Sequence, residues 1–79
     1  MKKIIDLLQE LYPEHADEFT ESDDFISDGL LDSFDIQTLF STIDEEYGVT
    51  LNGSDLAPQN FSSVESIRDL LENHGITGV

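Results

Sequence analysis

The chain has 79 residues and holds 18 aspartates and glutamates against three lysines and arginines, so its formal net charge at pH 7 is -15. Such a charge repels nucleic acids and anionic membranes, which argues against both as partners and favours basic protein surfaces. A domain of this length hides only about 60–65% of its unfolded surface, and a core that small rarely encloses a catalytic pocket. Cysteine is absent, which excludes disulfides and thiolate metal sites.

The first predicted helix runs from about Lys2 to Tyr12. Its apolar residues recur at steps of three and four, namely Ile4, Leu7, Leu8, Leu11 and Tyr12. Pro13 is expected to end it, because proline cannot continue a helix. Acidic residues interrupt this apolar stretch, so it is neither a signal peptide nor a membrane span, and we expect a cytoplasmic protein.

A long acidic connection follows, from Glu14 to Asp32. A loop of this length needs contacts with the core, and Phe19, Phe25 and Ile26 are the expected anchors. The stretch from Ala16 to Phe19 either prolongs the first helix or forms a separate turn, and the sequence leaves both possibilities open.

The clearest periodicity predicts a second long helix from about Ser33 to Tyr47. Its apolar face is formed by Ile36, Leu39, Phe40, Ile43 and Tyr47. Asp32 stands at the N-cap position, where its carboxylate would accept from backbone N–H groups, and Ser33 falls in the first turn. The positive end of the helix dipole would favour a phosphate at that turn. Gly48 is expected to end the helix.

The last third of the chain predicts one short and one longer helix. Val49 to Leu51 should be a loop that packs on the core, and Ser54 to Pro58 a single helical turn. Ser62 and Glu65 have the spacing of a capping box, which would start the last helix near Ser63. Gly75 should end that helix, with Ile76 folding back on it.

Together these elements predict an all-α fold with one domain over residues 1–79. We expect a small bundle of three longer helices and one short helix, with the long acidic loop between the first and second helices. The initial methionine and the lack of a flanking linker favour a free-standing protein.

One run of residues at the start of the second long helix carries a family resemblance. It reads Gly29-Leu30-Leu31-Asp32-Ser33-Phe34. This run, in a small acidic chain with helices on both sides, resembles the phosphopantetheine attachment site of acyl and peptidyl carrier proteins. It looks most like the site of stand-alone D-alanyl and aminoacyl carriers. That family implies the same acyl-carrier-like helical bundle.

The resemblance implies a carrier that is not an enzyme. Ser33 would hold 4′-phosphopantetheine covalently, and the thiol of this arm would carry an aminoacyl or acyl group as a thioester. Asp32 would help the modifying enzyme to hold a transient metal during loading, and no resident metal is expected. The implied partners are a phosphopantetheinyl transferase, an adenylating enzyme that loads the arm, and a downstream acyl or aminoacyl transferase. We expect a monomer.

Acidic residues of the second long helix are the expected contacts for those partners. They are Asp35, Asp44, Glu45 and Glu46. The plainer interpretation is that they only keep one helix face in solvent. A calcium loop starting at Asp24 fails, because Ile26 stands where an oxygen ligand is required and Asp35 replaces the long bidentate glutamate.

The cargo and one alternative function remain open at this point. Phe34, Phe40 and Phe61 could fill the bundle with aromatic rings, which favours a small aminoacyl group over a long acyl chain. A fatty-acid or polyketide carrier is the alternative within the same family. An unmodified acidic adaptor that binds a basic protein belongs to a different class, and it would not need the hydroxyl of Ser33.

Overall fold

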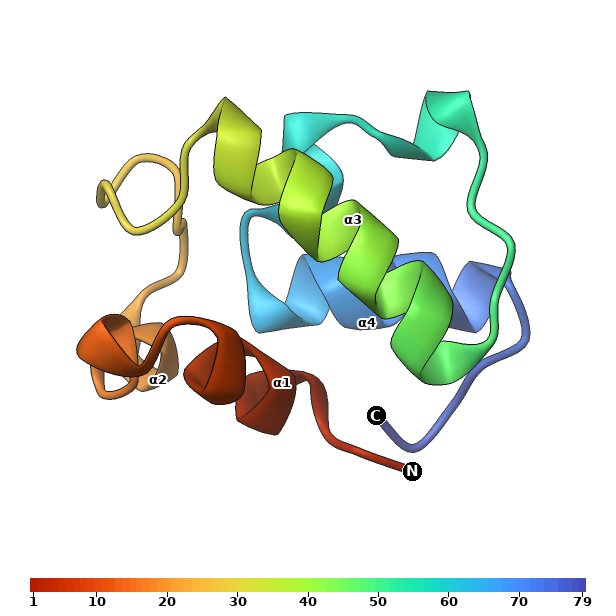
Figure 1. The fold of residues 1–79 in the computed structure, drawn as a ribbon, viewed down its shortest axis with the longest axis horizontal. Coiled ribbons are helices and arrows are strands. Elements are labelled where there is room, and N and C mark those ends of the chain that lie inside the picture. The colour runs from red at the N-terminus through yellow and green to blue at the C-terminus, as the bar shows by residue number, and fades with distance from the viewer.

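Three helices, α1 (Ile4–Leu11), α3 (Ser33–Tyr47) and α4 (Val64–Asn73), surround the hydrophobic core in the computed structural model, which describes residues 1–79 (Figure 1). A fourth helix, α2 (Glu18–Glu21), is a single turn. Three 3₁₀ turns complete the chain, η1 (Pro13–His15), η2 (Gly53–Asp55) and η3 (Pro58–Phe61). The predicted all-α class is confirmed. No helix is long and apolar enough to span a bilayer.

Helix α1 ends where the sequence predicts. Its inward face buries Ile4, Leu7 and Leu8. Tyr12 is the C-cap of α1, and Pro13 begins η1 instead of continuing the helix.

The acidic connection between α1 and α3 holds a separate turn of helix, α2, which settles the alternative that the sequence left open. Phe19 and Phe25 are buried and meet edge to face, with ring centroids 5.1 Å apart. Ile26 is not an anchor, because its side chain is 37% exposed. Asp24 explains this difference: its Oδ1 accepts from the backbone N–H groups of Ile26 and Ser27, and this local turn leaves Ile26 on the surface.

The segment after α3 differs from the prediction in one respect. Val49 and Leu51 are buried, as expected. The single turn predicted over Ser54–Pro58 is wrong, since the structure has two 3₁₀ turns, η2 and η3. Asn52 caps η2, and proline at position 58 starts η3, where its fixed φ is favourable and its missing N–H costs nothing.

Helix α4 begins one residue later than the predicted capping box requires. Ser63 is the N-cap and its Oγ accepts from the N–H of Ser66 at 3.0 Å. Ser62 instead donates to the carbonyl of Gln59, so the box between Ser62 and Glu65 is wrong. The end of the helix is as predicted. Gly75 has a φ of 84°, and the N–H of Ile76 returns to the carbonyl of Leu71 at 2.9 Å.

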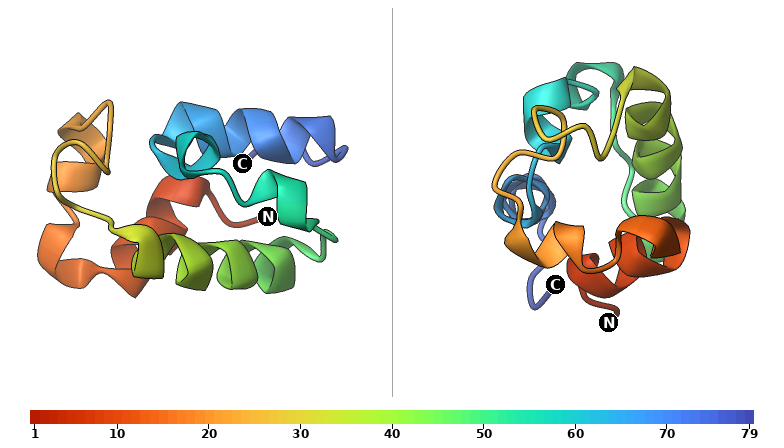
Figure 2. Two further views of the ribbon diagram at one scale, coloured as in Figure 1. Left: turned by 90° about the horizontal axis from the view of Figure 1, so that it is seen from above. Right: turned by 90° about the vertical axis from the view of Figure 1, so that its left-hand side faces the viewer.

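The two chain termini lie close to each other and away from the start of α3 (Figures 1 and 2). The N–H of Ile4 donates to the carbonyl of Val79 at 3.0 Å, and Val79 is buried. The hydroxyl of Tyr47 donates to the carbonyl of Lys2 at 2.9 Å, which joins the end of α3 to the start of α1. These contacts leave the first turn of α3 free of the termini.

Candidate functional site

The loop that leads into α3 is fixed by two buried leucines. The backbone N–H groups of Leu30 and Leu31 both donate to the carbonyl of Phe25, at 2.8 and 3.2 Å. Gly29 makes the preceding turn possible because its φ of 77° lies in the left-handed region, which side chains disfavour. With both leucines in the core, the chain emerges at the surface directly afterwards, at Asp32.

Asp32 is the N-cap of α3, as the sequence predicts. Its Oδ1 accepts from the N–H of Asp35 at 2.9 Å, and the Oδ2 of Asp35 accepts from the N–H of Asp32 at 3.1 Å. This reciprocal pair satisfies two backbone donors that the helix itself cannot pair. It fixes the direction of the first turn and therefore the position of Ser33.

Ser33 is the first residue of α3 and is exposed. Its backbone begins the helix, while its hydroxyl takes part in none of the side-chain hydrogen bonds that hold the neighbouring loop. The first turn also carries the positive end of the helix dipole, which stabilises an attached phosphate. Because Ser33 is exposed and its hydroxyl is unpaired, a group attached there would displace no hydrogen bond of that side chain.

A small groove of about 150 Å³ opens beside the hydroxyl. It is lined by Ser33, Ile36, Gln37, Leu56 and Pro58. One wall therefore comes from α3 and the other from the segment that joins η2 to η3. Leu56 is 38% exposed, so part of this groove presents apolar surface beside the serine.

Phe34 does not fill the bundle, contrary to the expectation. Its side chain is 76% exposed, because it follows Ser33 on the outer face of the first turn. The other two rings do lie inside: Phe61 is fully buried and Phe40 packs against it, with centroids 6.2 Å apart.

The four acidic residues expected to contact partners have different surroundings. Asp35 is half-buried in the cap, and Asp44 is half-buried with its Oδ2 accepting from the N–H of Leu51 at 3.0 Å. Glu46 is exposed and lies 3.7 Å from the ammonium of Lys2. Glu45 is exposed and forms no hydrogen bond or ion pair within the chain. Of the four carboxylates, only that of Glu45 is free to meet a partner without loss of a contact within the chain.

Tyr12 is a neighbour of the site, although the sequence pattern indicates only that it belongs to the apolar face of the first helix. Its phenol lies 3.5 Å from the carbonyl of Asp35, to which it donates. Burial, together with the nearby carboxylates of Asp35 and Asp32, raises the pKa of Tyr12 to about 12. The phenol therefore stays protonated at neutral pH and contributes no base to the site.

Comparison with known proteins gives one match. The family model described as "Phosphopantetheine attachment site" matches residues 2–72. No curated protein and no solved structure matches. Domains of this family are non-catalytic carriers, and their cofactor is covalently bound 4′-phosphopantetheine. Because the match covers most of the 79 residues, the chain belongs to the phosphopantetheine attachment site family of carrier proteins.

Proposed function

We propose that this chain, as a single carrier domain over residues 1–79, bears 4′-phosphopantetheine on Ser33. The observation that carries the proposal is the exposed, unpaired hydroxyl at the capped first turn of α3, inside the region that matches the family. When bound, the cofactor supplies a flexible arm with a terminal thiol, which holds cargo as a thioester.

Attachment needs a separate enzyme, because a serine hydroxyl is a weak nucleophile by itself. The oxygen of Ser33 forms a bond to the phosphorus next to the pantetheine in coenzyme A. The pyrophosphate bond breaks, the nucleotide part leaves, and the hydroxyl proton passes to a base of the phosphopantetheinyl transferase. The carrier supplies the positioned hydroxyl, and the transferase supplies the chemistry.

Asp32 has one carboxylate oxygen for each of two roles. Its Oδ1 accepts from the N–H of Asp35 in the helix cap, whereas its Oδ2 has no hydrogen-bond partner in the chain. The free oxygen is thus available to the metal that accompanies coenzyme A during loading. We expect this contact to be transient, shared with the transferase, and absent from the resting carrier.

The cargo we propose is a small aminoacyl group such as D-alanyl, loaded by an adenylating enzyme and removed by a downstream transferase. The packed rings of Phe40, which is partly buried, and Phe61, which is fully buried, support this choice, because they fill space between α3 and η3 and leave less of it for a long acyl chain. A fatty-acid or polyketide carrier is the alternative. We further propose that the chain is a monomer and not an enzyme; a cytoplasmic location stays a prediction.

Cargo is tested by supplying the modified protein with candidate substrates. An adenylating enzyme with ATP and D-alanine should add the mass of one alanyl group, and hydroxylamine should remove it, as expected of a thioester. A parallel experiment uses an acyl-transferring enzyme with malonyl or fatty acyl donors. Efficient acylation there, with no aminoacylation, would replace the aminoacyl assignment by the acyl one.

A genetic test separates the carrier from the acidic adaptor. The natural gene is replaced by one that encodes Ser33→Ala, with Ser41→Ala as the control, because Ser41 is an exposed serine elsewhere on α3. A carrier loses all function with the first change and none with the second. Full function of Ser33→Ala would establish the adaptor instead.

A further inference from the structure

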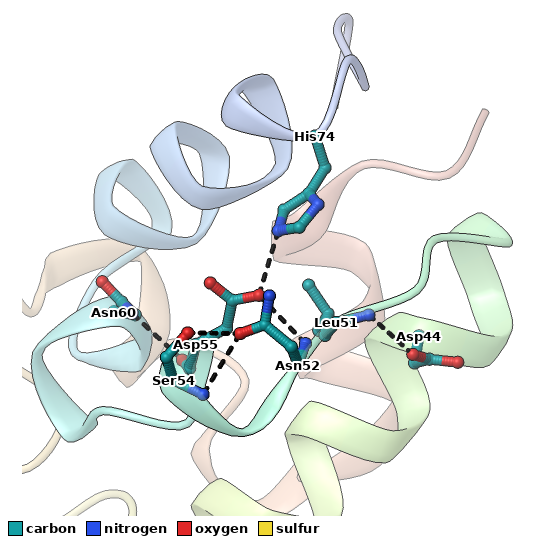
Figure 3. Close-up of polar contacts among 7 residues, drawn as sticks. All are labelled: Asp44, Leu51, Asn52, Ser54, Asp55, Asn60 and His74. Atoms are coloured by element: carbon teal, nitrogen blue, oxygen red, sulfur yellow. Dashed lines mark hydrogen bonds and ion pairs between the residues drawn. The ribbon is translucent and has the colours of Figure 1, made fainter.

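A hydrogen-bonded pair joins the end of α4 to the η2 turn (Figure 3). The Nε2 of His74 lies 3.0 Å from the Oδ2 of Asp55, and the two side chains are only 24% and 18% exposed. The same carboxylate oxygen accepts from the backbone N–H of Asn52 at 3.1 Å. Asp55 is therefore held from two sides, by its own turn and by the last helix.

Asp55 also fixes the segment that follows it. Its backbone carbonyl accepts from the Nδ2 of Asn60 at 3.0 Å, which ties η2 to η3. The N–H of Leu56 donates to the carbonyl of Gly53 at 3.3 Å. Residues 56–59 are thus held by hydrogen bonds at both ends. The contact between Asp55 and His74 connects this segment to the end of α4.

The segment of residues 56–59 forms one wall of the groove at the candidate site. Leu56 and Pro58 face Ser33 across that groove. A transferase that brings coenzyme A within bonding distance of the Ser33 oxygen must cover the surface around it, and this wall lies within that surface. The position of the wall therefore affects how well the transferase fits, although neither Asp55 nor His74 lines the groove.

We propose that Asp55 and His74 are positioning residues for the loading of Ser33. Their hydrogen bond holds the Leu56–Pro58 wall in the place where the transferase contacts it. The proposal rests on the proposed function of Ser33. Since neither side chain lines the groove beside the reacting hydroxyl, loss of the pair should weaken binding of the carrier and leave the chemical step unchanged.

The experiment measures steady-state loading of the full chain by a phosphopantetheinyl transferase with coenzyme A and Mg²⁺. Asp55→Ala and His74→Ala should each raise KM for the carrier about three- to tenfold with kcat unchanged. The double variant should be no worse than either single variant, because the two residues act through one contact. Asp55→Asn and His74→Gln keep an acceptor and a donor and should restore KM.

His15 provides the matched control. It is the other histidine and also contacts a carboxylate, with its Nδ1 3.2 Å from Glu18, but it lies in the turn after α1 and not near the groove. His15→Ala should leave KM unchanged. Leu56→Ala alters the wall directly and should raise KM even if an Asp55 variant folds poorly, which circular dichroism would reveal.

The outcomes distinguish failure of the proposed function of Ser33 from failure of the positioning role of Asp55 and His74. If folded wild-type protein is never loaded, the proposed function of Ser33 fails. If it is loaded, and the Asp55 and His74 variants show the KM of His15→Ala, the positioning role is overturned. Additive effects in the double variant would also overturn it, since they would show two independent contributions.

Discussion

Asp32 and Asp35 each accept a hydrogen bond from the other's backbone N–H, at 2.9 and 3.1 Å, and so close the first turn of α3 around Ser33. Both carboxylates accept from backbone N–H groups in the cap, whereas the exposed side chain of Ser33 has no hydrogen-bond partner. The same contacts cap the helix and position Ser33, the proposed modification site.

Substitution of Asp32 should separate its role in the helix cap from its proposed role in holding a metal during loading. Asp32→Ala removes the cap and should lower the free energy of unfolding by about 1 kcal/mol, while Asp32→Asn keeps a capping oxygen and should cost only a few tenths, roughly 0.3 kcal/mol. Both variants lose the charge available to a metal, so both should be loaded about tenfold more slowly or worse. Urea denaturation and loading rates are measured side by side. Normal loading of Asp32→Asn would show that the carboxylate has no role beyond the cap.

Glu45 offers the cleanest test of electrostatic recognition. Reversal of Asp35 would open the cap and reversal of Asp44 would release the N–H of Leu51, whereas Glu45 has no contact to lose. Glu45→Lys should lower kcat/KM for loading about two- to tenfold at low salt, with a smaller effect at high salt, because a basic partner would be repelled.

The control for that prediction is Asp69→Lys, an equal charge reversal at an exposed position on α4. If both reversals slow loading equally, net charge and not a local surface would govern recognition. If neither reversal has any effect, the acidic residues only solvate the helices.

The two tyrosines should titrate at unusually high pH. Tyr12 has its pKa raised to about 12 by burial and by Asp35, and burial also raises the pKa of Tyr47. A raised pKa in the folded state favours the neutral phenol, so the resulting stability is complete below pH 10 and is lost as pH rises toward about 12. Tyrosinate absorbance should show Tyr12 largely protonated near pH 10 in the native protein, and Tyr47 less ionised than an exposed tyrosine at the same pH. Midpoints equal to those in urea would contradict the burial and contacts described.

Added salt should stabilise the protein. The net charge of -15 repels itself within a small fold, and ionic strength shortens the range of that repulsion. A rise from about 10 to about 150 mM sodium chloride shortens the Debye length from roughly 30 to 8 Å and should raise Tm by several degrees. Potassium chloride should act equally well, since screening does not depend on the identity of the ion. A Tm that stays constant or falls would show that local ion pairs outweigh the net charge.

The long helices could be predicted because their signals are local. The periodicity from Ile36 to Tyr47 and the residues that bound α3, Asp32 and Gly48, lie within a few turns of each other. The same stretch placed Ser33 in the first turn of the helix, while its candidate role came from the resemblance of the run Gly29–Phe34 to carrier attachment sites.

The parts that could not be predicted depend on contacts distant in sequence or on choices between equal candidates. The contact between Asp55 and His74 joins residues 19 positions apart, and neither residue has a local pattern that selects the other. Ser62 and Ser63 are equally good caps by residue type, so only the tertiary position of the chain could decide between them. Phe34 was misplaced because an aromatic residue in the first turn of a helix can face either side.

The most direct test of attachment at Ser33 is the intact mass of the protein after incubation with coenzyme A, Mg²⁺ and a broad-specificity phosphopantetheinyl transferase. Ser33→Ala and Ser41→Ala are treated in parallel. Attachment at Ser33 predicts a gain of one phosphopantetheine on the wild type and on Ser41→Ala, and none on Ser33→Ala. A gain that persists in Ser33→Ala, or folded wild-type protein that gains nothing even with the transferase of its own host, would contradict it.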